Sequence, residues 1–493
     1  MNTQYNSSYI FSITLVATLG GLLFGYDTAV ISGTVESLNT VFVAPQNLNE
    51  SAANSLLGFC VASALIGCII GGALGGYCSN RFGRRDSLKI AAVLFFISGV
   101  GSAWPELGFT SINPDNTVPV YLAGYVPEFV IYRIIGGIGV GLASMLSPMY
   151  IAELAPAHIR GKLVSFNQFA IIFGQLLVYC VNYFIARSGD ASWLNTDGWR
   201  YMFASECIPA LLFLMLLYTV PESPRWLMSR GKQEQAESIL RKIMGNTLAT
   251  QAVQEIKHSL DHGRKTGGRL LMFGVGVIVI GVMLSIFQQF VGINVVLYYA
   301  PEVFKTLGAS TDIALLQTII VGVINLTFTV LAIMTVDKFG RKPLQIIGAL
   351  GMAIGMFSLG TAFYTQAPGI VALLSMLFYV AAFAMSWGPV CWVLLSEIFP
   401  NAIRGKALAI AVSPTGFTGV WAFWQHYLCG NLSRKPKVKP LRSWKPSGNR
   451  KRRKHNKLLR CNLPVQHAAP VRRAVFLLPL QPFRITQPQS DHQ

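Results

Sequence analysis

Apolar runs of about twenty residues recur ten times before residue 396. A helix needs roughly 20 such residues to cross the hydrocarbon core of a bilayer, and most of the runs are near that length. Because the chain is 52% hydrophobic and only 12% charged, the pattern predicts an all-α membrane protein that crosses the bilayer many times, and it argues against a soluble enzyme. The expected spans are Ile10–Ser32, Ala53–Tyr77, Leu88–Ala103, Val126–Met149, Leu163–Ile185, Tyr201–Val220, Leu270–Val291, Leu315–Val336, Leu344–Tyr364 and Ile370–Leu395.

Basic residues are distributed unequally between the two ends of the expected bundle. Of the 24 Lys and Arg before Ser413, 20 lie in five segments that span parity places on one side. Such an asymmetry predicts that this side, and the N-terminus with it, faces the cytoplasm. The five segments are Arg81–Lys89, Arg160–Lys162, Arg225–Arg269, Lys338–Lys342 and Arg404–Lys406.

Two loop motifs occur twice in the chain. Arg-Phe-Gly-Arg-Arg at 81–85 returns as Lys-Phe-Gly-Arg-Lys at 338–342, and the Glu…Arg-Gly motif at 153–161 returns at 397–405. Both copies lie on the basic side, so the repeat predicts two six-helix halves related by a pseudo-twofold axis along the membrane normal. The expected domains are a first half at 1–221, a linker with short surface helices at 222–269, a second half at 270–412, and a basic tail at 413–493 that is disordered or out of frame.

The seventh apolar run carries an unusual group of amides. Gln288, Gln289 and Asn294 are costly in a membrane unless they face a protein cavity, and Gly292 and Pro301 loosen the helix around them. Uncharged amides both donate and accept hydrogen bonds, as a neutral polyhydroxylated ligand such as a sugar requires. The alternative is that the amides only join helices.

A carboxylate lies deep in the first run and an arginine early in the fourth. An isolated Asp27 would cost several kcal/mol there, so it should be paired or able to take a proton, and Arg133 is the obvious partner. The functional interpretation is a proton switch, in which ionised Asp27 holds Arg133 and protonated Asp27 releases it. A static ion pair is the alternative.

Further candidates for a binding cavity lie in other runs. Gln168 and Gln175 are seven residues apart and share one helix face, although amides so placed can also serve helix packing. Trp392 and Gly388 in the tenth run offer a surface on which a sugar ring could stack. Phe24 and Tyr298 are lining candidates of second rank.

Glycines with a small-residue spacing predict close helix packing. They form the pairs Gly71/Gly75, Gly72/Gly76 and Gly137/Gly141.

Taken with Pro-Glu-Ser-Pro-Arg-Trp at 221–226 and Gln-Gln-Phe-Val-Gly-Ile-Asn at 288–294, the loop motifs resemble those of the sugar porter family of the major facilitator superfamily. The resemblance implies the major facilitator fold and uptake of D-xylose with protons, by alternating access, across a bacterial inner membrane. It ends at Val412: Thr415 and Gly416 stand where the family has a Gln-Trp pair, so the last two spans are doubtful.

The resemblance also implies roles for individual residues. Asp27 would carry the proton and Arg133 would modulate it. The implied sugar-binding residues are Gln168, Gln288, Gln289, Asn294 and Trp392.

Apart from the resemblance, the repeated acid–arginine pattern of the basic loops favours a latch that holds the outward-facing state. A merely solvated charged loop is the alternative. The predicted gating charges are Arg84, Glu153, Arg160, Glu222, Arg225, Arg341, Glu397 and Arg404.

Three alternatives remain open: a facilitative uniporter for similar monosaccharides, a sugar-binding form that the altered end makes unable to transport, and a membrane sensor or enzyme. No catalytic constellation, phosphate loop or metal cluster favours the last, so no cofactor and no metal are expected. The expected partners are the monosaccharide, the proton and the lipid bilayer, and the protein is expected to be a monomer. The basic run at 450–454 favours non-specific adhesion over specific binding of nucleic acid.

Overall fold

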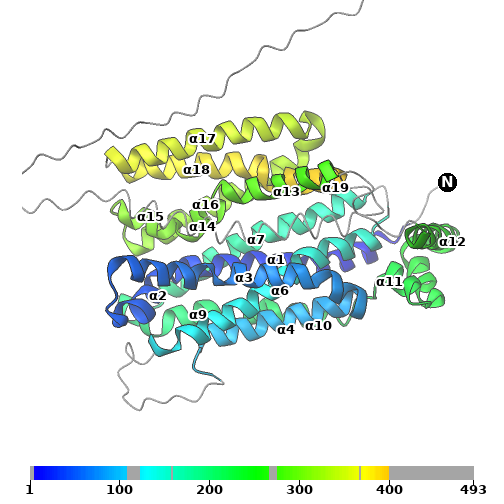
Figure 1. Ribbon diagram of the computed structural model, residues 1–493, viewed down its shortest axis with the longest axis horizontal. Helices are drawn as coiled ribbons and strands as arrows, with labels where there is room; N and C mark the ends of the chain where they lie inside the picture. Colours follow the sequence, from blue (N-terminus) through cyan, green and yellow to red (C-terminus); the bar gives the residue numbers. More distant parts are fainter. Residues whose placement is uncertain (1–4, 108–122, 157–158, 266–274, 366–367, 399–493) are drawn as a thin grey trace, which may run out of the picture. The chain divides into compact units, whose positions relative to one another are not determined.

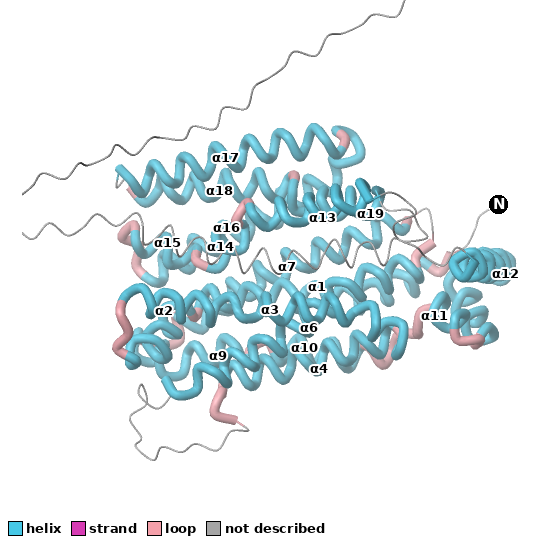
Figure 2. Tube along the Cα trace, viewed as in Figure 1, coloured by secondary structure: helices cyan, strands magenta, loops and turns pink. Residues whose placement is uncertain are grey.

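The computed structural model describes residues 5–107, 123–156, 159–265, 275–365 and 368–398. Across these ranges the chain is helical and contains no strand. Ten of its helical segments are long and apolar enough to cross a membrane, which agrees with the ten expected spans (Figures 1 and 2). The prediction for the tail at 413–493 lies outside the described residues.

The long helices follow the order of the expected spans. In the first half they are α1 (Ser7–Val30), α3 (Glu50–Phe82), α4 (Arg84–Ala103), α6 (Val126–Leu154), α7 (Arg160–Ala186), and the pair α9 (Trp199–Ala204) and α10 (Cys207–Leu216). In the second half they are α13 (Val275–Phe290), α14 (Ile293–Tyr298), α15 (Ala300–Thr306), α16 (Thr311–Phe339), α17 (Arg341–Thr365), α18 (Gly369–Met385) and α19 (Trp387–Ile398).

Short elements connect the long helices. They are η1 (Ile31–Gly33), α2 (Val35–Leu38), η2 (Asn39–Val43), η3 (Ala44–Gln46), η4 (Ala123–Tyr125), α8 (Ala191–Trp193) and η5 (Leu194–Gly198). In the linker, α11 (Pro224–Ser229) precedes α12 (Gln233–Lys265), which is kinked at Gly245, where φ is +73°.

Three spans are interrupted, each beside a polar residue. Gly292 has a φ of +83°, which glycine adopts without a steric penalty, and it separates α13 from α14. Ser386 separates α18 from α19 with φ −131° and ψ −87°, and Ser205 lies between α9 and α10. Interrupted helices are tolerated in membranes where protein or a water-filled cavity receives the freed backbone groups, so these breaks mark the interior of the bundle.

Glycines let α3 and α6 cross at close range. A Cβ added at Gly71 would lie 2.2 Å from the Ile138 carbonyl oxygen, and one at Gly137 would lie 1.9 Å from the Ala64 carbonyl oxygen. The predicted packing role is therefore confirmed there. It is wrong for Gly72, where an added Cβ meets no atom within 4 Å, because Gly72 lies on a different face of α3 from Gly71.

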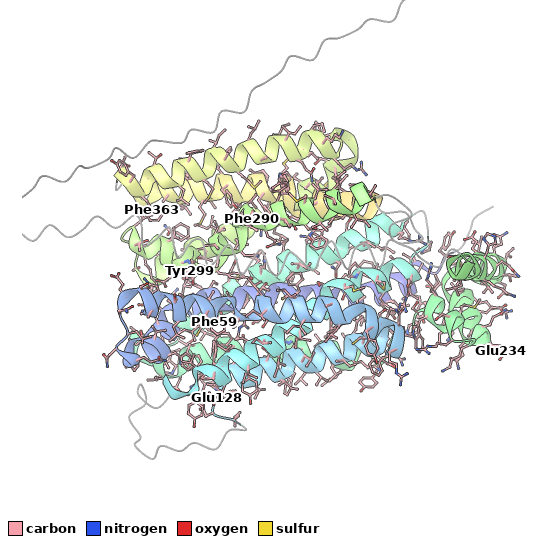
Figure 3. The ribbon with its side chains drawn as sticks, viewed as in Figure 1. Phe59, Glu128, Glu234, Phe290, Tyr299 and Phe363 are labelled. Carbon is pink, nitrogen blue, oxygen red and sulfur yellow. The ribbon has the colours of Figure 1, made fainter. Side chains whose placement is uncertain are left out.

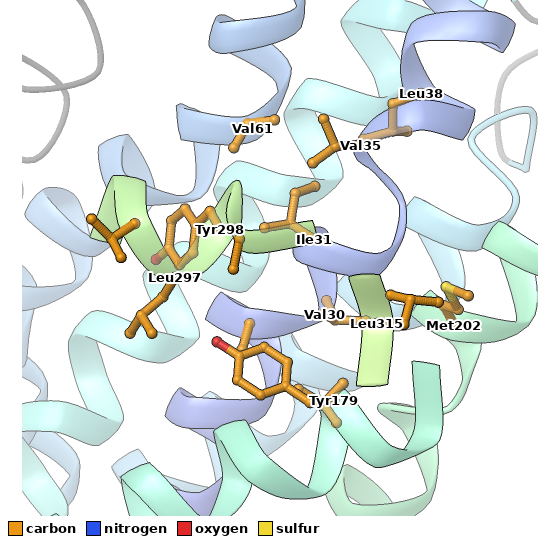
Figure 4. Packing of buried hydrophobic residues seen from close by; sticks show 14 of the residues in the cluster. Val30, Ile31, Val35, Leu38, Val61, Tyr179, Met202, Leu297, Tyr298 and Leu315 are labelled. Carbon is orange, nitrogen blue, oxygen red and sulfur yellow. The ribbon is translucent and has the colours of Figure 1, made fainter. Parts of the chain in front are cut away.

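The hydrophobic clusters show where the two halves meet. The largest cluster combines Val30, Ile31 and Val35 from the first half with Leu297 and Tyr298 from the second (Figure 4). The next largest runs from Ile10 to Ile243 and is built from the first half and the linker, while α13 and α19 share a small cluster of their own. In the described chain, the large shared core thus lies at the end away from the basic loops, which we call the closed end; the opposite end is called the basic end.

Candidate functional site

Asp27 and Arg133 form an ion pair inside the first half. Nη1 of Arg133 donates to Oδ1 of Asp27 at 2.7 Å, and Nη2 donates to the Asp27 carbonyl oxygen at 3.2 Å. Both side chains are almost completely buried, with 0% and 1% of their surface exposed. The guanidinium carbon also lies 5.5 Å from the centre of the Phe203 ring. The structure therefore brings together the two residues that the sequence pairs.

A second buried carboxyl group, Glu206, belongs to the same site and interacts electrostatically with Asp27 and Arg133. Neither Glu206 oxygen has a donor within the described residues, and Oδ2 of Asp27 has none either. Two carboxylates are both acceptors, so they can bond to each other only when one carries a proton. One arginine between two acids would leave a net negative charge in a dry site, and a bound proton removes it.

Sequence reasoning missed Glu206, although the signal was the one that identified Asp27. Glu206 is an acid within the apolar run Tyr201–Val220. An acid within a membrane span is by itself a reason to suspect a functional site. The break at Ser205, whose Oγ lies 2.8 Å from the Tyr26 hydroxyl, places Glu206 beside α1.

Gln288 lies on the inner face of α13. It is 4% exposed, whereas Phe290, two residues later, is 44% exposed. Figure 3 labels Phe290. Its Nε2 donates to the carbonyl oxygens of Trp387 at 3.2 Å and Gly388 at 3.4 Å, at the break between α18 and α19. Its Oε1 is buried without a donor among the described residues, which leaves this oxygen able to accept a hydrogen bond from a ligand.

Gln289 and Asn294 form a pair across the Gly292 break. Nδ2 of Asn294 donates to Oε1 of Gln289 at 2.7 Å. This bond fixes which way the Gln289 amide points, because its oxygen must face Asn294. Both residues are partly exposed.

Gln175 bonds to the other half of the molecule. Its Oε1 accepts from Nδ2 of Asn325 at 3.2 Å, from α7 to α16. Gln168 lies two turns earlier on the same face of α7 and is partly exposed. A Cβ added at Gly322 would lie 2.9 Å from the Tyr179 ring, so α7 and α16 also touch closely one turn further along.

The apolar candidates for the binding cavity differ in how deeply they are buried. Tyr298 is 4% exposed and lies in the shared core, while Phe24 and Trp392 are partly exposed. Gly388 is buried, and a Cβ there would come 3.3 Å from the Phe383 ring.

Predicted gating charges gather where α4 begins. Nη2 of Arg84 lies 2.8 Å from Oε1 of Glu153. Oε1 of Glu222 accepts from the backbone N–H groups of Arg84 at 2.9 Å and Ser223 at 2.7 Å, so a carboxylate sits at a helix N-terminus, where it is favoured. Burial nevertheless raises the pKa of Glu222, against the opposing effect of these N–H groups.

The other predicted charges are less closely tied. Arg160 is exposed and donates to the Ala155 carbonyl oxygen at 3.4 Å. Arg225 donates to Oγ of Ser259 at 3.3 Å. Arg341 begins α17, and the predictions for the Glu397 side chain and for Arg404 lie outside the described residues.

Comparison with known proteins identifies the family. The family model described as "Sugar (and other) transporter" matches residues 13–428. The D-xylose-proton symporter of Escherichia coli strain K12 is 97% identical over 424 residues, 86% of each chain. The glucose facilitated diffusion protein of Zymomonas mobilis is 42% identical over 85% of this chain and 86% of its own, and the arabinose-proton symporter of Bacillus subtilis is 40% identical over 83% of each.

Two solved structures extend the likeness to three dimensions. A partially occluded inward-open conformation of the E. coli xylose transporter XylE has a TM-score of 0.79 at 91% identity, covering 86% of this chain and 92% of that one. The same transporter with bound 6-bromo-6-deoxy-D-glucose has a TM-score of 0.79 at 95% identity, covering 87% and 90%. The predicted family and fold class are confirmed, and the chain belongs to the sugar porter family of the major facilitator superfamily.

Proposed function

We propose that this protein carries D-xylose together with protons across the bacterial inner membrane, with its basic end and N-terminus in the cytoplasm. The observation that supports this proposal best is the buried group of Asp27, Arg133 and Glu206. A facilitator that moves only a neutral sugar has no need for two acids and one base in a dry interior, where they are expensive.

In the proposed cycle, the proton and the sugar bind at neighbouring places. With Asp27 ionised, its carboxylate accepts one hydrogen bond from Arg133, and its backbone carbonyl oxygen accepts a second. A proton on Asp27 weakens that pair and frees α1 and α6 to move relative to each other. Glu206, which is fully buried and interacts electrostatically with Asp27, is a second place where the proton can reside, so it would modulate release.

We assign the sugar to the space between the halves that Gln168, Gln288, Gln289, Asn294 and Trp392 border. Oε1 of Gln288 has no donor within the described residues and would accept from a sugar hydroxyl. Tyr298, Phe24 and Gly388 would pack against the ring. Gln175 would contribute through its hydrogen bond with Asn325, which joins α7 to α16. We further propose that the first half ends at residue 221, the linker at 269 and the second half at 412. The protein is proposed to be a monomer.

We assign the predicted latch to charged residues at the basic end, where Arg84 and Glu153 pair within the first half. Arg160, Glu222, Arg225, Arg341, Glu397 and Arg404 would contribute to it. The latch would hold the outward-facing state and break as the basic end opens.

Two alternatives share this fold. One is a facilitative uniporter, a possibility that the Zymomonas relative keeps open because its name describes facilitated diffusion. The other is a sugar-binding form that no longer transports, because Thr415 and Gly416 stand where the family has a Gln-Trp pair and the family match ends at residue 428.

Xylose uptake into vesicles with an imposed pH gradient tests the proposal. We expect accumulation above the external concentration, driven by the gradient and abolished by a protonophore. Uptake that only equilibrates would favour the uniporter, and binding without uptake would favour the transport-defective form. A matched chain with a family-type C-terminus is the control, and equal rates would show that the altered end is harmless.

A double-mutant cycle tests the pair of Gln289 and Asn294. We expect Gln289→Ala and Asn294→Ala each to weaken xylose binding by about five- to tenfold, as expected when a buried hydrogen bond is lost. Because Asn294 orients the Gln289 amide, the double variant should bind scarcely worse than either single one. Calorimetric titration measures this, and fully additive losses would show that the two amides act independently.

A further inference from the structure

We infer that Lys305 is a two-position latch at the closed end, held there by Glu36 of the other half and drawn away by Glu302 of its own helix. The assignment of this end to the outside of the cell rests on the proposed function, whereas the latch itself does not. Nothing in the repeated loop motifs concerns these three residues, which lie at the opposite end from the basic loops.

The contacts are those of one cation between two acids. Nζ of Lys305, on α15, bonds to Oε2 of Glu36, on α2. The same Nζ lies 3.3 Å from Oε1 of Glu302, one turn back on α15. The side chain of Lys305 is 19% exposed, against 51% for Glu36 and 31% for Glu302. The first bond crosses between the halves, and the second stays within one of them.

The latch lies over the core that the two halves share. Val35, next to Glu36, and Phe304, next to Lys305, both belong to that cluster. Figure 4 shows Val35 of α2 close to Ile31, which in turn lies close to Tyr298. Opening this end must therefore separate these apolar surfaces and break the bond between Lys305 and Glu36 together.

Glu36 and Glu302 have opposite effects on the equilibrium between the closed and the open state of this end. When the end opens, Lys305 loses Glu36 but keeps Glu302, so the cation is never left without a partner. Glu302 therefore stabilises the open state relative to the closed one, and it also repels Glu36 when the end is closed. A merely structural ion-pair cluster would weaken in the same direction whichever acid was removed.

Labelling of Cys60 reports opening of this end. Cys60 is fully buried in the shared cluster, against which Tyr299 also packs. Its reaction with a membrane-impermeant maleimide, followed by mass spectrometry of its peptide in the whole protein, measures how often the end is open. Right-side-out and inverted membrane vesicles are compared.

We expect Glu36→Gln to speed this labelling and Glu302→Gln to slow it, each by about two- to fivefold, the range for a partly exposed ion pair. Lys305→Met should speed labelling at least as much as Glu36→Gln, because the two acids then face each other unpaired. The control is Glu106→Gln, which removes a pair with Arg200 at 2.9 Å within one half and should leave the rate unchanged.

Changes of the same sign in the two acid variants, or no change in either, would overturn the latch. Thermal unfolding of each variant separates these outcomes from a general loss of stability. A change of the expected sign that occurs only in inverted vesicles would support the latch and contradict the proposed orientation. Xylose accumulation, measured separately, tests the proposed function without reference to Cys60.

Discussion

Replacing Asp27 by asparagine should abolish uphill accumulation of xylose while leaving xylose binding and exchange in place. The amide has nearly the same shape as the carboxylate, and its oxygen can still accept from Nη1 of Arg133, now 2.7 Å away. It cannot be ionised, however, so it cannot hold and release a proton during the cycle. Uptake with and without a pH gradient, together with counterflow of labelled xylose, measures the two properties separately.

The matched control is Asp197→Asn, the same substitution at an exposed acid in η5. We expect it to accumulate xylose at the parent rate. Continued accumulation by the Asp27 variant would remove Asp27 from the proton path and leave Glu206 as the remaining buried acid of this group. Loss of binding as well would indicate a structural ion pair, since breaking a buried pair leaves a charge without a partner.

The family includes both coupled and uncoupled transporters. The relatives at 42% and 40% identity are described, respectively, as a facilitated diffusion protein and as a proton symporter, so one fold accommodates both activities. The relative at 97% identity is described as a D-xylose-proton symporter. The proposed coupling rests on that likeness together with the buried group of Asp27, Arg133 and Glu206.

The sequence allowed much of the fold to be predicted because a bilayer restricts the choices. Apolar runs of sufficient length can only be helices there, and the duplicated loops predicted the two halves. Asp27 and Arg133 were predicted as partners because each is costly alone in a membrane. Gly292 was predicted as a break, and its φ of +83° explains why glycine is needed.

Other features depend on helix rotation and on contacts between distant segments. The sequence does not show that Nε2 of Gln288 donates to the Trp387 carbonyl oxygen at the break after α18, because these residues are 99 positions apart in the chain. Nor does it show that Lys305 bonds to Glu36 across 269 residues. Gly71 and Gly72 are each followed by a glycine four residues later, so the spacing alone does not predict which of the two faces α6.

That difference leads to a second large effect: Gly71→Ala should destabilise the protein, whereas Gly72→Ala should not. At Gly71 the new methyl group would lie 2.2 Å from the Ile138 carbonyl oxygen. The contact is with backbone rather than with a flexible side chain, so α3 and α6 must move apart. Overpacking of this kind costs about 1–3 kcal/mol, and the shift would spread to Gly137, whose own added Cβ would come even closer to α3.

The neighbouring position provides the control within the same helix. At Gly72 the methyl group meets nothing within 4 Å, and alanine favours a helix over glycine by about 0.8–1.0 kcal/mol. The two variants should therefore shift the thermal unfolding midpoint in detergent in opposite directions. Xylose uptake should fall only in Gly71→Ala, because Arg133 lies one turn before Gly137 on α6 and moves with it. Equal behaviour of the two variants would mean that α3 and α6 do not cross at Gly71, and the placement of Arg133 against Asp27 would then lose its main support.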